Sequence, residues 1–314
     1  MAQAREPATA DGAPRTAVFT ALAAVAPMTW GTTYLVTTQF LPPDRPLLSG
    51  VLRTLPAGLV LLLLTHALPR GRWWWRCAVL GVLNIGAFNA LLFVAAYRLP
   101  GGVAATLTSM QPLLVAGLGI VLLGERPTPW RLGWGVAGVA GVALMVLRGN
   151  ATFDVLGIVA GVAAAASMAT GIVLVKRWGA PTGVGVLAFT GWQLTAGGLL
   201  LVPLAVLFEG ALPHFDAAAV GGYAWLAVVG TLVAYALWFQ GVGRLPVAAV
   251  SFLVLLSPVV ATALGWLALG EPLTTLQTAG FLLAMASIVG AQLTPQAARA
   301  LLDAIPRTRA SATR

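Results

Sequence analysis

The chain has 314 residues, of which 59% are hydrophobic and 9% are charged. Soluble domains carry roughly a quarter charged residues, so this composition excludes a soluble globular protein and predicts an integral membrane protein. The net charge of +9 does not indicate a nucleic-acid-binding protein, because the cations stand in short gaps between apolar runs instead of clustering on one polar face.

The N-terminal segment, residues 1–16, is polar and carries Arg5 and Arg15 ahead of the first apolar run. This arrangement resembles the charged start of a signal peptide. The apolar run is long enough to span a membrane and many similar runs follow, so we expect it to be retained as a first helix. The single cysteine, Cys77, excludes an internal disulfide, and the absence of metal-ligand spacing predicts no metal and no cofactor.

Ten apolar segments follow one another along the chain, separated by short stretches with Pro, Gly, Arg or acidic residues. A membrane-spanning helix needs about 20 mostly apolar residues, and each segment approaches that length. The predicted spans are 17–39, 46–68, 74–97, 101–123, 130–148, 154–177, 183–208, 218–243, 247–269 and 274–293.

Lys and Arg concentrate on alternate connections between these spans. With the N-terminus in the cytoplasm, most of the 18 basic residues fall on cytoplasmic segments; the exceptions are Arg45, Arg98 and Arg148 outside, and Arg53 within a span. Cytoplasmic loops of membrane proteins carry an excess of Lys and Arg. The bias therefore predicts a multi-pass inner-membrane protein with both termini in the cytoplasm.

One stretch of the sequence occurs twice in outline. YRLPGGVAATLTSMQPLLVAGLGIVLLGE, which begins at Tyr97, is echoed from Gly243 by GRLPVAAVSFLVLLSPVVATALGWLALGE. A weaker echo at a shift of 140 positions pairs Met28 with Met168 and Gly31 with Gly171. The main shift is 146 positions, and it matches Phe93 with Phe239, Arg98 with Arg244, Pro112 with Pro258, and Glu125 with Glu271.

Two copies of five spans must enter the membrane with opposite polarity, because five is an odd number. Inverted-topology repeats are typical of secondary transporters, in which a midplane site opens alternately to either side. The sequence therefore predicts an all-α integral membrane protein with ten transmembrane helices in two inverted-topology five-helix repeats. The repeats are 17–148 and 149–293, between a polar cytoplasmic tail at 1–16 and a basic cytoplasmic tail at 294–314.

Several of these segments resemble one known family. MTWGTTYL in the first span, LRTLPAG in the second, and RLPGGVAATLTSMQP leading to GERPT, with a counterpart ending in GEPLT, resemble the EamA branch of the drug/metabolite transporter superfamily. Within that branch the chain is most similar to YddG-type exporters of aromatic and other amino acids. The resemblance implies export from the cytoplasm, and it places spans 130–148 and 274–293 at the periphery, where a homodimer would form.

Arg53 is the ionisable residue that lies well inside a predicted span. A charge in the hydrocarbon costs about 2.5 kcal/mol or more at the centre, so such a residue is a functional candidate. One interpretation is a structural or gating anchor, whose long stem reaches the headgroups or helix-end carbonyls. The other is a group that draws a carboxylate substrate into the membrane.

Two glutamates and two prolines form a second set of gating or structural candidates. Glu125 and Glu271 each end a span beside a Pro-containing turn, where we expect them to fix the corner by accepting hydrogen bonds, with coupling as the alternative. Pro112 and Pro258 fall midway along their spans, where each removes a backbone hydrogen bond and frees a carbonyl. Freed carbonyls need partners or a wet cavity.

Uncharged polar residues around these prolines predict a substrate-binding cavity near the membrane midplane. The alternative is that their hydroxyls join neighbouring helices. An Asn in lipid is costly, so Asn84, which shares a helix face with Phe88, is expected to face the cavity or a neighbouring helix. The polar candidates near the prolines are Thr106, Ser109, Gln111, Ser251 and Ser257.

Aromatic residues in the first and eighth spans complete the predicted site. Trp30 and Tyr34 lie in 17–39, and Tyr235 and Trp238 in 218–243. Aromatic residues in membrane helices are commonly lipid-facing or placed at the interface. These four lie deeper than an interfacial belt, so they also suit a stacking wall for an aromatic or apolar solute.

The sequence thus predicts a secondary transporter that exports small metabolites, among them aromatic and other amino acids, through a midplane cavity. Its partners would be a small-molecule substrate and the lipid bilayer, with no nucleic acid. A broad drug or cation exporter is the alternative within transport. An intramembrane enzyme or a receptor is the alternative of another class. The enzyme is disfavoured because no acid–base pair accompanies a nucleophile, and the receptor because an inverted duplication has no evident purpose there.

Overall fold

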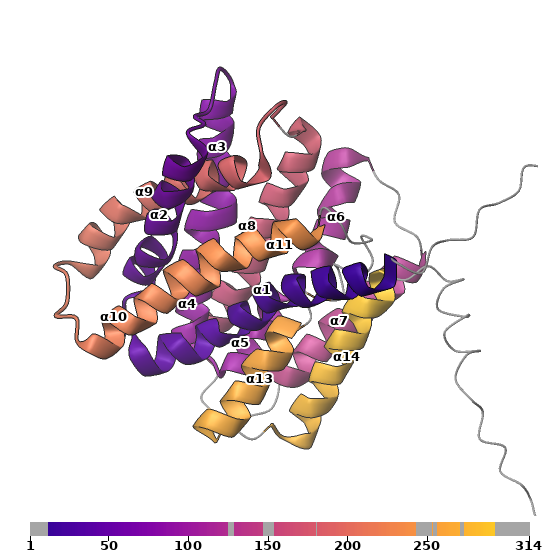
Figure 1. The fold of residues 1–314 in the computed structure, drawn as a ribbon. Helices are drawn as coiled ribbons and strands as arrows, with labels where there is room; N and C mark the ends of the chain where they lie inside the picture. The colour runs from indigo at the N-terminus through magenta and orange to yellow at the C-terminus, as the bar shows by residue number, and fades with distance from the viewer. Residues whose placement is uncertain are drawn as a thin grey trace, which may run out of the picture.

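The computed structural model describes residues 12–124, 129–146, 154–179, 181–242, 253, 256–270 and 273–292. These residues form α-helices and two π-helices, drawn in Figure 1. The first half contains α1 (Gly12–Phe40), α2 (Pro46–Thr65), α3 (Trp73–Gly81), η1 (Val82–Ala87), α4 (Phe88–Arg98), α5 (Gly101–Thr108), α6 (Gln111–Leu123) and α7 (Pro129–Val146). The second half contains α8 (Val155–Trp178), α9 (Val186–Glu209), α10 (Ala217–Ala224), η2 (Trp225–Val233), α11 (Ala234–Val242), α13 (Leu256–Leu269) and α14 (Thr275–Gln292).

Six continuous helical segments within the described residues are long and apolar enough to cross a membrane. They confirm an all-helical, multi-pass membrane protein among the described residues, whereas the full set of ten spans stays a prediction. The expected spans 74–97 and 101–123 each consist of more than one helical element. The six segments are Pro46–Thr65, Trp73–Arg98, Gly101–Leu123, Val155–Trp178, Val186–Glu209 and Ala217–Trp238.

Each half contains a π-helix at the same place in the repeat. A shift of 146 positions carries η1, Val82–Ala87, onto 228–233, the last six residues of η2. A π-helix widens the turn and leaves carbonyls without their usual α-helical partners. Side chains supply those partners: Ser167 donates to the Leu83 carbonyl at 2.7 Å, and Thr231 donates to the Leu226 carbonyl at 2.9 Å.

The predicted proline break is present in the first half. α5 ends at Thr108 and α6 begins at Gln111, with Pro112 in the first turn of α6. A proline is tolerated in a first turn because the amide that it lacks has no partner there. Pro258 likewise lies in the first turn of α13, where it is buried.

Equivalent helices from the two halves pack against each other in antiparallel pairs. On α2 and α9, a Cβ added to Gly58 would lie 2.6 Å from the Thr195 nitrogen, and one added to Gly198 would lie 2.8 Å from the Leu55 Cβ. The shift of 140 positions carries Gly58 onto Gly198 and Leu55 onto Thr195. The contact is therefore reciprocal, as at an interface with two-fold symmetry.

α7 and α14 repeat this arrangement at one side of the bundle (Figure 1). A Cβ on Gly138 would lie 2.6 Å from the Ser287 hydroxyl, and one on Gly141 would lie 2.6 Å from the Ala284 nitrogen. The shift of 146 positions carries Gly138 onto Ala284 and Gly141 onto Ser287. The peripheral placement of these two helices agrees with the expectation, and a homodimer contact on them stays a prediction.

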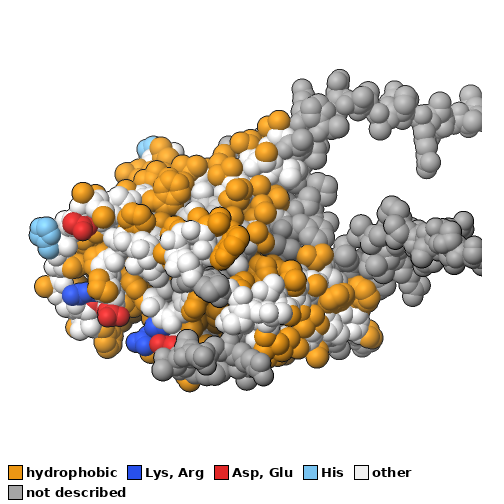
Figure 2. All heavy atoms as spheres, turned by 90° about the horizontal axis from the view of Figure 1, so that it is seen from below, with side chains coloured by type: hydrophobic (Ala, Val, Ile, Leu, Met, Phe, Trp, Pro, Cys, Tyr) orange, Lys and Arg blue, Asp and Glu red, His pale blue; other side chains and the backbone are white. Residues whose placement is uncertain are grey.

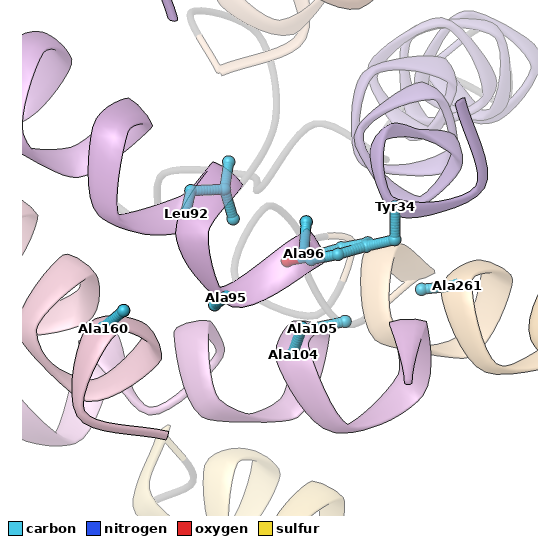
Figure 3. Close-up of a cluster of buried hydrophobic side chains, with 8 residues drawn as sticks. All are labelled: Tyr34, Leu92, Ala95, Ala96, Ala104, Ala105, Ala160 and Ala261. Carbon is cyan, nitrogen blue, oxygen red and sulfur yellow. The ribbon is translucent and has the colours of Figure 1, made fainter. Parts of the chain in front are cut away.

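The remaining helices cross between the halves. α1 packs against α11 and α13, whereas α8 packs against α4 and α6. Small residues allow this close approach: Figure 3 shows the Tyr34 ring, from α1, lying over Ala96 of α4 and beside Ala104 and Ala105 of α5. Dense packing of small side chains is how helices associate where lipid is as apolar as the protein.

Some polar contacts between the halves lie at helix ends. The Glu209 carboxylate accepts hydrogen bonds from the Leu47 and Leu48 amides at 2.6 and 2.9 Å and so caps the start of α2. Arg98 forms a 3.0 Å ion pair with Asp154, which also caps α8. Over the face drawn in Figure 2, hydrophobic side chains dominate and the few charged ones lie toward one side.

Candidate functional site

Arg53 is buried within the bundle, with only 8% of its surface exposed. It is the eighth residue of α2, about 10 Å along the helix axis from Pro46. Its Nε donates to the Thr231 hydroxyl of η2 at 3.4 Å, while its Nη1 is buried without a hydrogen-bond partner. The side chain therefore ends inside the bundle and not at its surface.

No carboxylate balances this guanidinium within the described residues. Each described acidic residue lies at a helix end or in a loop: Asp44, Asp154, Glu209 and Asp216. The neighbours of Arg53 are instead aromatic. Its Cζ lies 5.9 Å from the ring centroid of Phe93, and Thr231 lies one residue after Gly230, whose carbonyl accepts from Trp30. A cation over an aromatic face is stabilised by the ring quadrupole.

Three of the predicted aromatic residues meet near this place, where α1 and α11 pack together. The Trp30 ring lies 5.7 Å from the Tyr235 ring and 5.5 Å from the Trp238 ring, both in tilted arrangements. The Trp30 Nε1 donates to the Gly230 carbonyl of η2 at 3.1 Å. Tyr34, one turn further along α1, is buried, and its hydroxyl forms a 3.0 Å hydrogen bond with the Thr108 hydroxyl. The wide turn of η2 thus fixes both Arg53 and Trp30.

Asn84 lies within η1 and contacts the second helix of the other half. Its Nδ2 donates to the Gln193 Oε1 of α9 at 2.7 Å, while its Oδ1 is buried without a partner and presses against Gly171. This contact between halves is one of the two alternatives that the sequence left open. The shift of 140 positions carries Arg53 onto Gln193, so each half directs one long polar side chain from its second helix to the π-helix of the other half.

The hydroxyls of Thr106 and Ser109 each donate a hydrogen bond to the carbonyl four residues earlier in the chain. The Thr106 hydroxyl donates to the Gly102 carbonyl at 2.8 Å, and the Ser109 hydroxyl donates to the Ala105 carbonyl at 2.7 Å. Such bonds satisfy a hydroxyl without a partner helix or a cavity. Phe88 packs beside the alanine-rich cluster around Tyr34.

The other predicted residues are dispersed. Gln111 is half-buried at the start of α6, and Ser257 lies in the first turn of α13, where its carbonyl would lie 2.6 Å from a Cβ on Gly31. α5 and α13 do pack together, as expected for the two proline-containing segments. Ser251, Glu125 and Glu271 lie outside the described residues.

A cavity of about 370 Å³ opens between α13 and α14 and is apart from the predicted residues. Its lining is mainly apolar and includes Trp266, Phe281 and Thr262, whose buried hydroxyl has no hydrogen-bond partner. Among the described residues, no group of three His, Cys, Asp or Glu side chains could hold a metal ion.

Three residues were not singled out by the sequence pattern: Phe93 and Thr231, which contact Arg53, and Gln193, which contacts Asn84. Phe93 was noted only as a repeat match, although it is fully buried against the guanidinium. Extending the shift of 140 positions beyond Gly31 would have paired Gln193 with Arg53 and marked it as a candidate. No sequence signal marks Thr231, because its role depends on the π-helical turn.

The comparisons with known proteins agree with this architecture. The model of the EamA-like transporter family matches twice, at residues 17–147 and 155–292. A solved structure that is 22% identical aligns with a TM-score of 0.62 over 90% of this chain and 99% of its own. At that identity the likeness supports the fold alone.

Three relatives show the range of similarity, and two of them are transporters by name. Protein PecM of Dickeya dadantii is 44% identical over 84% of this chain and 89% of its own length. The uncharacterized inner membrane transporter YedA of Escherichia coli K12 is 29% identical, over 79% and 82% of the two chains. A probable terminal-alkyne amino-acid exporter of Streptantibioticus cattleyicolor is 27% identical, over 70% and 74%. The duplicated family match and the two inter-half helix pairs lead to one conclusion: the chain belongs to the EamA-like transporter family, within the drug/metabolite transporter superfamily.

Proposed function

We propose that this protein is a secondary transporter that exports small metabolites, including aromatic and other amino acids, from the cytoplasm across the inner membrane. It would expose a central site alternately to the two sides by moving one half against the other. Ten transmembrane helices in two oppositely inserted halves, with both termini in the cytoplasm, complete the proposal.

The observation that carries this proposal is the reciprocal packing of equivalent helices. Gly58 and Gly198, at equivalent positions, each contact the other half through equivalent neighbours, on helices that run antiparallel. Two halves related in this way can exchange shapes, so that an opening on one side becomes an opening on the other. Alternating access uses that exchange.

The substrate class is supported by the aromatic side chains between α1 and α11. Trp30, Tyr235 and Trp238 present flat apolar surfaces, and Trp and Tyr rings stack well against aromatic solutes. One relative, 27% identical, is named a probable terminal-alkyne amino-acid exporter, and that name supports amino acids as substrates and export as the direction.

Transport by the purified full chain in proteoliposomes tests the proposal. Labelled phenylalanine, glycine and a bulky organic cation are loaded separately, with and without a pH gradient. We expect phenylalanine to move faster than the cation, in a manner that saturates with concentration. Preferential movement of the cation would replace the proposal with a drug exporter, and movement of none of the three would contradict transport of this class.

A further inference from the structure

The charge of Arg53 is not neutralised by any described part of the protein. The guanidinium is more than nine-tenths buried, its Nη1 has no hydrogen-bond partner, and the described acidic residues lie at helix ends or in loops. Burying a cation is costly unless it is paired and hydrogen-bonded. A buried, unpaired guanidinium is therefore a site that an anion would complete.

The fold does not itself require a cation at this position. The equivalent residue of the second half is Gln193, a neutral amide that is also buried and contacts the opposite π-helix through Asn84. A neutral side chain is thus sufficient for the contact between the second helix of one half and the π-helix of the other. The charge in the first half has no such structural explanation.

The neighbours of Arg53 leave part of its hydrogen-bonding edge available. Thr231 accepts from Nε alone, and Phe93 lies under the guanidinium rather than at its rim. Arginine presents its donors in a planar fork that matches the two oxygens of a carboxylate. The unpartnered Nη1 is one of these donors.

The aromatic rings near Arg53 indicate which chemical group the substrate carries beside its anion. Thr231, which accepts from Arg53, follows Gly230, whose carbonyl accepts from Trp30, and the Trp30 ring contacts the Tyr235 and Trp238 rings. One cation beside aromatic rings matches a ligand with one negative charge and an apolar part. A doubly charged phosphate needs more hydrogen-bond donors. We propose that Arg53 is the carboxylate anchor of the transport site and that the Trp30–Tyr235–Trp238 rings accept the apolar part of the same substrate.

This inference rests on the proposed function, so its test measures binding apart from transport. The purified full chain is heated in detergent with two matched pairs of probes: phenylacetate and phenylacetamide, and L-phenylalanine and L-phenylalaninamide. Inorganic phosphate is a separate probe. We expect the carboxylates to raise the unfolding temperature in a concentration-dependent way, and the amides and phosphate to have no effect.

Variants assign the effect to the guanidinium. Arg53→Gln, which places the residue of the second half in the first, should weaken phenylacetate binding by roughly tenfold to a hundredfold, the range for a lost hydrogen bond to a charged group. Arg53→Lys keeps the charge and should retain part of the affinity. Arg45→Gln is the matched control, because Arg45 lies at the start of the same helix and donates to the Glu209 carbonyl; it should bind as the wild type does.

Amides that bind as well as the carboxylates, phosphate that binds in their place, or no binding of either carboxylate would overturn the anchor. Wild-type affinity in Arg53→Gln would overturn it too. If that variant does not fold, the matched probes on the wild-type protein still decide the matter. Carboxylate binding without transport in proteoliposomes would contradict the proposed function alone, and transport without carboxylate preference would contradict the anchor alone.

Discussion

Trp238 is the predicted aromatic residue whose removal best separates binding from packing. Its ring contacts Trp30, which the Gly230 carbonyl of η2 holds in place. Trp238 is only half-buried, so its removal leaves the core of the bundle intact. The residue is therefore a suitable place to ask whether the rings recognise a solute.

We expect Trp238→Ala to lower kcat/KM for phenylalanine by up to about tenfold, because an aromatic pair contributes roughly 0.5–1.5 kcal/mol beyond its buried area. Glycine transport should change by less than about twofold. Trp266→Ala is the control, since Trp266 is exposed on α13. Initial rates in proteoliposomes give both values, and equal losses for the two solutes would instead indicate a packing role.

The contribution of Asp154 to stability should depend on pH. Its carboxylate accepts a hydrogen bond from the Gly157 amide and pairs with Arg98, and both interactions hold its pKa below the ordinary value of 3.8. A lowered folded-state pKa means that the contribution to stability is present above the unfolded pKa and is lost as pH falls through the folded pKa. The difference in unfolding temperature between wild type and Asp154→Asn should therefore shrink as the pH is lowered below 3.8. A difference that grows in acid would show that another group dominates.

At this scale the sequence identified some of the site and missed the rest for a definite reason. Arg53 was marked because a charge inside an apolar run is rare, and Trp30 and Trp238 because their rings lie deep in predicted spans. Phe93 and Thr231 contact Arg53 from other helices. Hydropathy gives the existence of a helix but not its rotation about its axis, and that rotation decides which side chains meet.

At the scale of elements, proline breaks could be predicted and π-helices could not. A proline disrupts a helix by lacking an amide, so Pro112 identified the end of α5 from residue type alone. η1 and η2 contain no residue that requires a π turn. They are held by hydrogen bonds to carbonyls from Ser167 and Trp30 on other helices, which are tertiary contacts.

The α7–α14 pair offers a direct test of close packing. An added methyl group at Gly141 would lie 2.6 Å from the Ala284 backbone nitrogen, which a side-chain movement cannot relieve. Gly141→Ala should therefore destabilise the protein by about 1–3 kcal/mol, the usual cost of overpacking. Gly135→Ala on the same helix is the matched control: nothing lies within 4 Å of its added Cβ. It should be neutral or stabilising by up to about 1 kcal/mol, because alanine has the higher helix propensity.

Thermal unfolding of the two variants beside the wild type measures this difference. Equal unfolding temperatures for Gly141→Ala and Gly135→Ala would mean that α7 and α14 are further apart in the membrane than in the structure.

At the scale of the whole molecule, the repeat in the sequence foretold two related halves, and the family match at 17–147 and 155–292 confirms them. The duplicated Pro-to-Gly-Glu pattern was sufficient for that inference. The pattern did not reveal that α2 pairs with α9 and α7 with α14, because a repeat relates sequences without specifying which surfaces meet.

Opposite insertion of the halves predicts that equivalent loops lie on opposite sides of the membrane. The loop between α2 and α3 stands at the top of Figure 1 and the loop between α9 and α10 at its left edge. Cys77→Ala removes the one cysteine of the chain. On that background, Arg70→Cys should react with a membrane-impermeant thiol reagent only from the cytoplasm, and His214→Cys only from outside; both residues are exposed. Reaction of both from the same side would exclude inverted halves.

Arg53 and Gln193 occupy equivalent positions in the two halves but differ in charge. This difference is possible because the two halves are parts of one polypeptide. Two identical subunits with this fold would carry arginine at both places, and two like charges in a low-dielectric interior repel each other strongly. A single fused chain escapes that constraint, because each copy can mutate without its twin. Only one half then carries the positive charge. The two halves keep the same fold and the same packing, but only the first provides a cation.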